Sequence, residues 1–309
     1  MTLQQLEYII AVDQLRHFGR AAEQCRVTQP TLSAMIQKLE EELDTKIFDR
    51  NQQPITPTPV GTHIIAQARE VLAQAARIRN IIQEEKHSMT GIFRLGILPT
   101  IAPYLLPRFF PQLMKKYKGL DIRVREMKTA EIKEALLTGD IDAGILAQID
   151  GLEPYNQVHL FYEQYFAYVA REDELFRKEL IRTSDLAASR DLWLLDEGHC
   201  FRDQLLRFCQ LKGAQSSQLA YSLGSMETFM RMVESGKGIT FIPELAVRQL
   251  SQSQQELVRP FAIPTPTRQL ILITGKNFVR HTLLENLVRE IQSAVPKEML
   301  KLKGTQGLV

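Results

Sequence analysis

The residues with the most distinctive chemistry in this sequence are two cysteines, Cys200 and Cys209, which lie nine positions apart in LLDEGHCFRDQLLRFC. Cys200 follows an apolar, strand-like run and a Gly-His turn, and it opens a predicted helix. The dipole of that helix and a nearby cation would favour the thiolate form of Cys200. Because the thiolate is the nucleophilic form of cysteine, Cys200 is a candidate nucleophile.

Helical geometry keeps these two thiols apart. If residues 200–209 are helical, nine steps of about 100° place the thiols on opposite faces, roughly 13 Å apart along the axis. A disulfide needs Cα atoms about 4.4 to 6.8 Å apart, so oxidation would have to unwind the helix. Such a local covalent event can drive a two-state rearrangement. The alternative is that both cysteines are small core residues at the ends of an amphipathic helix.

No motif in the sequence is typical of a metal, a cofactor or a hydrolase site. The three cysteines, with Cys25 as the third, form no C-x-x-C pair and no Cys/His cluster with zinc spacing. There is no G-x-S-x-G elbow, and the Ser-Gly-Lys-Gly run at 235–238 lacks the spacing of a phosphate loop. We therefore expect no metal, no cofactor and no enzymatic activity.

Composition indicates a protein of two folded parts. The chain has 309 residues, which is too long for one ordinary domain, and its hydrophobic fraction of 44% is enough for a full core. It contains no run of about 18 apolar residues and no leader pattern at its start, so we expect a cytoplasmic location and no membrane. The net charge is only +2, so any polyanion must meet a local basic surface.

The first element expected is a compact helical module over residues 3–50. The proline-rich stretch NQQPITPTP follows it and is typical of a hairpin wing. A long helix should start after Thr58, with Pro59 in its first position. Apolar residues alternate four and three apart along it, as in the seam of a coiled coil. These residues are Ile64, Ala68, Val71, Ala75, Ile78 and Ile82. Two chains could pair there, or the helix could lie on its own domain.

Beyond Gly91, strand-like and helical runs alternate, which indicates an α/β unit with a mostly parallel sheet. Expected strands lie at 93–98, 121–127 and 141–147, and expected helices at 102–117 and 130–137. A second unit is expected from strands at 192–196, 219–223 and 238–243 and helices at 200–211 and 226–233. A strand at 268–276 and a helix at 282–295 follow. Two α/β lobes of this kind bind ligands in the crevice between them.

Residues 18–33 have the pattern helix, tight turn, helix. Small Ala21 and Ala22 allow close helix packing, Val27 fills the turn, and Thr28 can cap the next helix. In that helix Leu32, Ile36 and Leu39 should face the core. The opposite face carries groups that can contact phosphates or base edges in a major groove. They belong to Gln29, Thr31, Ser33, Gln37 and Lys38.

A helical hairpin with a solvated polar face is the alternative, since residues 1–90 hold ten Lys/Arg against eleven Asp/Glu. The acidic residues, however, cluster beyond the reading helix, whereas Arg50 lies beside the wing. This cluster contains Glu40, Glu41, Glu42 and Asp44. The reading face can therefore still be locally positive.

The segment FGRAAEQCRVTQPTLSAMIQKLEEELDTKIFDRNQQPITPTPVG closely resembles the winged helix-turn-helix signature of LysR-type transcription regulators. The resemblance continues through the linker helix and covers essentially the whole chain. It implies an α/β protein with a winged helix-turn-helix domain at 1–58 and a linker (dimerisation) helix at 59–90. A periplasmic-binding-protein-like, two-lobed regulatory domain would follow at 91–309. Lobe I would span about 91–161 and 268–309, and lobe II about 162–267.

The resemblance also implies partners and DNA contacts. Members form homodimers or homotetramers, bind interrupted palindromes in double-stranded DNA near promoters, and act on RNA polymerase. The positions that match DNA-contacting positions of the family are Gln29, Pro30, Thr31, Ser33, Gln37, Lys38, Arg50 and Thr58. One departure from the family is Ala34, where relatives often have a basic residue, so the base preference is left open.

The EGHC-x8-C segment, with Arg-Asp two and three residues past the first cysteine, resembles the sensor of hydrogen-peroxide-responsive members of the family. This resemblance implies that Cys200 is peroxidatic, that Cys209 is resolving, and that a cellular thiol reductant restores both. Cys25 has no counterpart and is expected in the core. The family's peroxide pocket is matched by Thr100, Thr129, His199, Asp203 and Arg268.

Each pocket residue has a purely structural alternative. Thr100 and Thr129 could cap helices, His199 could bond the backbone, and Arg268 could pair with a surface carboxylate. The function expected is an activator of oxidative-stress genes switched by a Cys200–Cys209 disulfide. The alternative hypothesis is a LysR-type regulator that responds to a small metabolite bound between the lobes.

Overall fold

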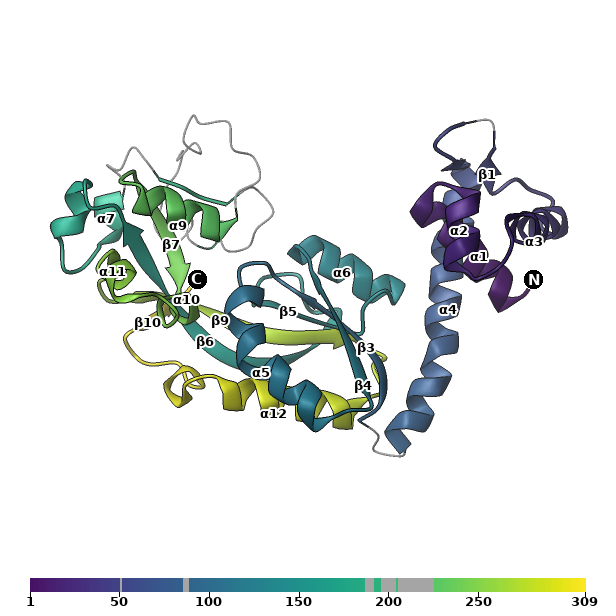
Figure 1. Ribbon diagram of the computed structural model, residues 1–309. Coiled ribbons are helices and arrows are strands. Elements are labelled where there is room, and N and C mark those ends of the chain that lie inside the picture. The colour runs from purple at the N-terminus through teal and green to yellow at the C-terminus, as the bar shows by residue number, and fades with distance from the viewer. Residues whose placement is uncertain (51, 86–88, 187–191, 196–203, 205–224) are drawn as a thin grey trace. The chain divides into compact units, whose positions relative to one another are not determined.

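The structure is a computed structural model that describes residues 1–50, 52–85, 89–186, 192–195, 204 and 225–309. Two compact units are recognised: Met1–Lys86 with Leu137–Asp140, and His87–Leu136 with Ile141–Val309 (Figure 1). The expected helix at 200–211 and strand at 219–223 lie outside the described residues, except for Gln204. Among the described helices, none is long and apolar enough to cross a membrane.

The N-terminal unit is built on three short helices and a two-stranded wing. The elements are α1 (Leu3–Leu15), α2 (Phe18–Gln24), α3 (Gln29–Glu42), β1 (Phe48–Asp49) and β2 (Thr56–Pro57). Each helix begins at a side chain that accepts a backbone N–H of its first turn, namely Thr2, His17 and Thr28. These caps fix the helix starts because the first N–H groups of a helix have no partner inside it.

Apolar residues at helical spacing close the core of this unit as the sequence predicts. Leu32, Ile36 and Leu39 of α3 have no exposed surface, and Ala21 and Ala22 of α2 are at most 2% exposed. The small alanine side chains let the helices approach closely. The helix-turn-helix prediction is therefore confirmed at the level of the backbone and the core.

The predicted apolar seam of helix α4 (Pro59–Glu85) is buried in one part and exposed in another. Near its start, Ala68 is buried, together with Ile65, against the core of the N-terminal unit. Further along, Ile78 is 64% exposed and Ile82 is 53% exposed. The alternative that α4 lies on its own domain therefore holds for the part around Ala68, whereas the seam residues Ile78 and Ile82 near its end are exposed within the described chain.

The C-terminal unit contains the predicted parallel strands and their helices. Strand β3 pairs with β4 and β5 in parallel, and α12 packs on α5 (Figure 1). The bounds are β3 (Gly91–Ile97), α5 (Ala102–Lys116), β4 (Leu120–Glu126), α6 (Thr129–Thr138), β5 (Ala143–Ala147) and α12 (His281–Ala294). Every one of these elements overlaps an expected one.

The expectation of a mostly parallel sheet is wrong, because two long strands run antiparallel to their neighbours. Strand β6 (Tyr155–Val169) pairs antiparallel with β9 (Thr265–Gly275), and β9 pairs antiparallel with β5. Beyond Gln164, β6 pairs with β7 (Ile239–Pro243) and β8 (Val258–Pro260). The sheet order is β4-β3-β5-β9-β6-β7, and β10 (Gln306–Leu308) adds to β9 in parallel.

The remaining elements are short. They are α7 (Thr183–Leu186), α9 (Met226–Glu234), α10 (Glu244–Val247), α11 (Gln252–Gln255) and the 3-10 turns Glu174–Arg177 and Lys297–Met299. Of the expected strand at 192–196, the described residues 192–195 form one bridge, between Leu192 and Ile239. Buried apolar side chains from all the strands β3 to β7 and β9 form one continuous core in this unit.

Gly61 is required where α4 leaves the wing. A Cβ atom at this position would lie 2.0 Å from the backbone oxygen of Ile47. A backbone atom cannot move aside as a flexible side chain can, so Gly61→Ala should lower the free energy of unfolding by about 3 kcal/mol. Gly275→Ala is the control, since nothing lies within 4 Å of its added methyl group. Urea unfolding measures both, and equal stability of the two variants would contradict the packing described.

Candidate functional site

The polar face of α3 is the candidate DNA-reading surface. Its exposed residues are Gln29, Pro30, Thr31, Gln37 and Lys38, and Ser33 is half-buried. Hydroxyl, amide and ammonium groups on one exposed face can reach phosphates and base edges in a major groove. The structure therefore brings these expected residues onto one face, and their contact with DNA stays a prediction.

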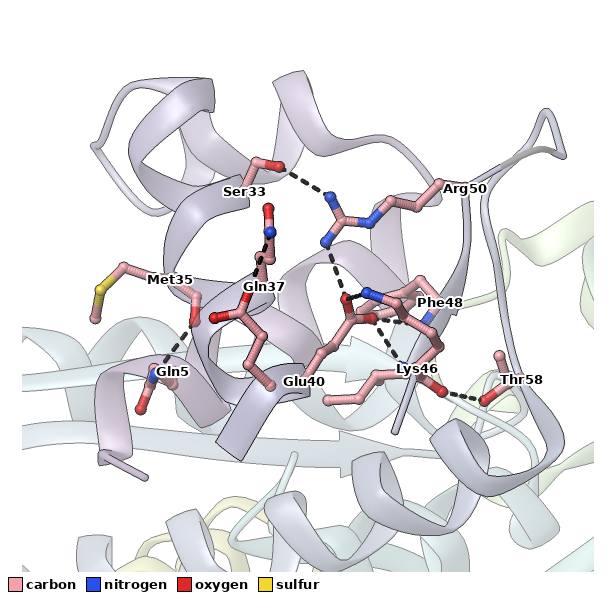
Figure 2. A network of polar contacts seen from close by, with 11 residues as sticks. Gln5, Ser33, Met35, Gln37, Glu40, Lys46, Phe48, Arg50 and Thr58 are labelled. Carbon is pink, nitrogen blue, oxygen red and sulfur yellow. Dashed lines mark hydrogen bonds and ion pairs between the residues drawn. The ribbon is translucent and has the colours of Figure 1, made fainter. Parts of the chain in front are cut away.

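A buried carboxylate, Glu40, joins the end of α3 to the wing (Figure 2). Glu40 is 2% exposed, and its Oε1 accepts the backbone N–H of Ile47 at 2.8 Å and of Phe48 at 3.3 Å. Its Oε2 accepts from Arg50 Nη2 at 3.1 Å and from Lys46 Nζ at 3.4 Å. Charge-assisted hydrogen bonds to a buried carboxylate are strong, so Glu40 fixes the start of the wing relative to α3.

Several of the expected DNA-contacting residues, among them Arg50, Ser33 and Thr58, form hydrogen bonds inside the unit. The guanidinium of Arg50 also donates to Ser33 Oγ at 3.3 Å and lies 5.2 Å from the centre of the Phe18 ring. The hydroxyl of Thr58 accepts the N–H of Gly61 at 2.9 Å and donates to the backbone oxygen of Lys46 at 2.7 Å. Thr58 therefore caps α4, as its position before Pro59 predicts.

Sequence reasoning missed a cleft beside the start of α3. Its lining includes Arg16, His17, Arg20 and Gln29, together with the wing residue Gln53. Two arginines and an imidazole beside the reading helix suit a phosphate of the DNA backbone. The sequence does contain the basic residues around His17. They form a cleft only because the fold places the start of α2 next to the wing, which the sequence does not show.

In the C-terminal unit, Arg268 forms a buried polar centre. The side chain has no exposed surface, and it lies on β9 directly opposite Glu163 of β6. Its Nε and Nη2 donate to Glu163 Oε2 at 2.9 and 2.7 Å. Its Nη1 donates to the Thr100 hydroxyl and its Nη2 to the Thr100 backbone oxygen, both at 3.1 Å. The carboxylate partner is thus buried rather than on the surface.

Glu163 is the functional candidate that the sequence did not reveal. It is 1% exposed and also accepts the backbone N–H of Leu245, at 3.0 Å, where α10 begins. Burial raises the pKa of the Glu163 carboxyl, and the Arg268 guanidinium opposes that rise. A single glutamate in a mixed polar and aromatic strand carries no local signal of burial, so only the strand pairing identifies it.

Thr100 and Thr129 do not cap helices. Each lies three residues past the paired ends of parallel strands, Ile97 of β3 and Glu126 of β4. The Thr100 hydroxyl accepts from Arg268, so its own proton is available to a ligand. The Thr129 hydroxyl is buried and has no hydrogen-bond partner among the described residues. A buried hydroxyl group without a partner, such as that of Thr129, past the carboxyl end of a parallel strand is typical of a binding site.

The other residues expected to form the sensor, namely Cys200, Cys209, His199 and Asp203, lie outside the described residues. Cys25 is half-buried at the end of α2, and burial together with the nearby Glu7 raises the pKa of its thiol. A raised pKa disfavours the reactive thiolate, which fits the expected role of Cys25 as a packing residue.

Glu40→Gln tests whether the buried carboxylate holds the wing. The amide keeps the size of the side chain but loses the charge that faces Arg50 and Lys46, so we expect the free energy of unfolding to fall by about 2 kcal/mol. Glu41→Gln is the control, because Glu41 is exposed and should change stability by about 0.5 kcal/mol at most. Urea unfolding measures the stability of both variants, and the same midpoint for both would rule out the role of Glu40 in holding the wing.

Glu163→Gln tests the buried ion pair. Removing one partner leaves the Arg268 charge uncompensated in the core, so we expect a loss of about 3 to 5 kcal/mol in the free energy of unfolding. The control is Glu256→Gln, which breaks an exposed ion pair with Arg171 and should cost about 1 kcal/mol or less. A loss at Glu163 no larger than at Glu256 would mean that the pair contributes little.

Two family models match the chain. The bacterial regulatory helix-turn-helix protein model of the lysR family matches residues 3–62, and the LysR substrate binding domain model matches residues 86–296. Together they cover the reading helix, the wing and both Thr100 and Arg268.

Relatives match over nearly the full length. A "Hydrogen peroxide-inducible genes activator" from Dickeya chrysanthemi is 32% identical over 98% of this chain and 99% of its own. A full-length OxyR variant from Pseudomonas aeruginosa has a TM-score of 0.76 at 36% identity, covering 94% of this chain and 98% of that one. OxyR from Porphyromonas gingivalis is 52% identical with a TM-score of 0.66, covering 71% of this chain and 99% of that one. The chain therefore belongs to the LysR family of bacterial transcription regulators.

Proposed function

We propose that this protein is a hydrogen-peroxide-sensing transcription regulator that activates oxidative-stress genes and is switched by a reversible Cys200–Cys209 disulfide. The observation that carries the proposal is the buried Arg268–Thr100 pair, because a fixed cation and a hydroxyl group suit the reduction of a peroxide bond. The relatives named as hydrogen peroxide-inducible genes activators, which match over almost the same length, support this proposal.

The chemistry requires two steps. The Cys200 thiolate attacks one oxygen of hydrogen peroxide, the O–O bond breaks, and the departing hydroxide takes a proton to leave as water. The Cys209 thiol then attacks the sulfenic sulfur of Cys200, forming the disulfide and releasing a second water. A cellular dithiol returns both cysteines to thiols by exchange. One protein molecule is used per signal, so the protein acts as a sensor rather than as an enzyme.

The pocket residues supply orientation and charge. The Thr100 hydroxyl, held by Arg268, can donate to peroxide, and the unpaired Thr129 hydroxyl can do the same. Donors fixed before the reaction stabilise the charge on the departing oxygen. His199 and Asp203 join this set through their positions beside Cys200 in the sequence.

The rest of the chain would carry the signal. We assign DNA binding to residues 1–58, pairing of chains to 59–90 and sensing to 91–309, with lobes divided near 162 and 268. The exposed Ile78, Ile81 and Ile82 of α4 offer an apolar face for a second copy, in a dimer or a tetramer of this cytoplasmic regulator. The polar face of α3 would contact DNA, and bound protein would act on RNA polymerase.

Thiol counting by mass spectrometry tests the proposal. We expect one equivalent of hydrogen peroxide to remove two thiols from the reduced protein as an intramolecular Cys200–Cys209 bond. Cys200→Ser should abolish this loss because it removes the nucleophile, and Cys25→Ser should leave it unchanged. If all thiols survive a large excess of peroxide, the sensor proposal fails, and a small metabolite bound between the lobes becomes the better reading.

A further inference from the structure

The residues of the candidate site in the C-terminal unit have almost no exposed surface. Thr100 is 3% exposed, Thr129 is 8% exposed, and Arg268 has no exposed surface. A ligand reaches such groups only if it is small or if the residues that cover them move. The contacts that hold the elements around Thr100 together therefore bear on the size of the ligand that the site admits.

Tyr104 lies in the first turn of α5, four residues past Thr100, and joins two parts of the C-terminal unit. Helix α5 packs on β4 and α12, whereas α9 packs on β7 and carries Glu227 in its first turn. The Tyr104 hydroxyl donates to Glu227 Oε1 at 2.6 Å. The Tyr104 backbone oxygen accepts from the side-chain amide of Gln249, past α10, at 3.3 Å. Tyr104 is therefore fastened to the part that contains β7 by its side chain and by its backbone.

The Tyr104 hydroxyl lies where the buried ion pair approaches an exposed carboxylate. Burial raises the pKa of this hydroxyl, and its hydrogen bond to Glu227 adds to the rise, so the hydroxyl keeps its proton and donates it to the bond. The charges of Glu163 and Arg268 also act on this pKa, in opposite directions. Glu227, in contrast, is exposed. The bond between Tyr104 and Glu227 therefore lies between the buried centre and solvent.

Two thioethers pack around the same hydroxyl. The sulfur atoms of Met226 and Met230, one turn apart on α9, lie 3.6 and 4.0 Å from the Tyr104 hydroxyl oxygen, and both residues are buried. A hydrogen bond to a carboxylate is stronger than one between neutral groups, and apolar surroundings strengthen it further. The contact between α5 and α9 is thus polar and closely packed, so a ligand that passes between them must break the bond.

We propose that the Tyr104–Glu227 hydrogen bond closes the candidate site and restricts it to a ligand as small as hydrogen peroxide. This inference rests on the proposed function, because it takes the site around Thr100 and Arg268 as the peroxide site. Tyr104 and Glu227 are positioning residues, since they act by holding α5 against α9. While the bond is made, hydrogen peroxide enters and larger hydroperoxides are excluded. When the bond is removed, both enter.

The test compares hydrogen peroxide with tert-butyl hydroperoxide as oxidants of the reduced protein, with thiol loss followed over time by mass spectrometry. In both reactions the Cys200 thiolate takes the terminal oxygen and the O–O bond breaks. The leaving group takes a proton and departs as water or as tert-butanol. We expect the wild-type protein to prefer hydrogen peroxide. Tyr104→Phe should reduce this preference about tenfold, because it removes a hydrogen bond to a charged group.

Tyr168→Phe is the matched control. Tyr168 of β6 donates to Glu234 at the end of α9 at 3.0 Å, so this variant loses a tyrosine–glutamate bond that does not involve α5. It should leave the preference unchanged, since a general loss of stability affects the reactions with both oxidants alike. Glu227→Ala, at an exposed position, should act like Tyr104→Phe, and the double variant should go no further. An unchanged preference in both single variants, or an equal fall in Tyr168→Phe, would overturn the closure.

Hydrogen exchange separates this inference from the sensor proposal. Tyr104→Phe should raise amide exchange in the first turns of α5 and α9, whereas Tyr168→Phe should leave α5 unchanged. If neither oxidant removes thiols from the wild-type protein, the sensor proposal fails, and exchange that does not rise in Tyr104→Phe overturns the closure as well. If hydrogen peroxide removes the thiols but the preference does not depend on Tyr104 or Glu227, the closure fails and the sensor proposal stands.

Discussion

A buried arginine and a buried glutamate, Arg268 and Glu163, face each other where strand β6 changes partners. Glu163 is the register partner of Arg268 on β9, and from Tyr165 onward β6 pairs with β7 instead. Moving two charges out of water is unfavourable by several kcal/mol per ion, so every hydrogen bond around the pair must be made. This constraint fixes the loop after β3 through Thr100 and the start of α10 through Glu163. The C-terminal unit is organised around that requirement.

The N-terminal unit uses a buried charge in a similar way. Glu40 takes four donors, two from the backbone at the start of the wing and two from basic side chains (Figure 2). Because the carboxylate satisfies backbone groups that have no partner in a helix or sheet, the wing can be short and still have a defined position. Arg50 donates to Ser33 of the reading helix and is held by this carboxylate, whereas Lys38 is an exposed cation on the reading face.

Local patterns predicted most elements of this fold. Helix caps at Thr28 and Thr58, small residues at Ala21 and Ala22, and strand-like runs such as 141–147 are signals contained within a few residues. Strand β6, the longest of the described strands, was not predicted from the sequence. Its sequence mixes buried tyrosines with polar residues, and a register irregularity between His159 and Phe161 interrupts the alternation. Because β6 was not predicted, the sheet was expected to be mostly parallel, whereas β6 and β9 form its antiparallel part.

The sequence by itself determined the helix-turn-helix, the family and the identity of the chemically distinctive residues, because those depend on residue types at short, fixed spacings. Through the resemblance to the family, it also identified Arg268 and Thr100 as candidate pocket residues. Only the tertiary structure decided that Arg268 pairs with Glu163, that Glu40 is buried, and that Gln204 bonds to Val309. Arg268 and Glu163 lie 105 residues apart in the sequence, and so do Gln204 and Val309. Strand pairing brings such residues together, and the burial of polar groups then selects which of them must bond.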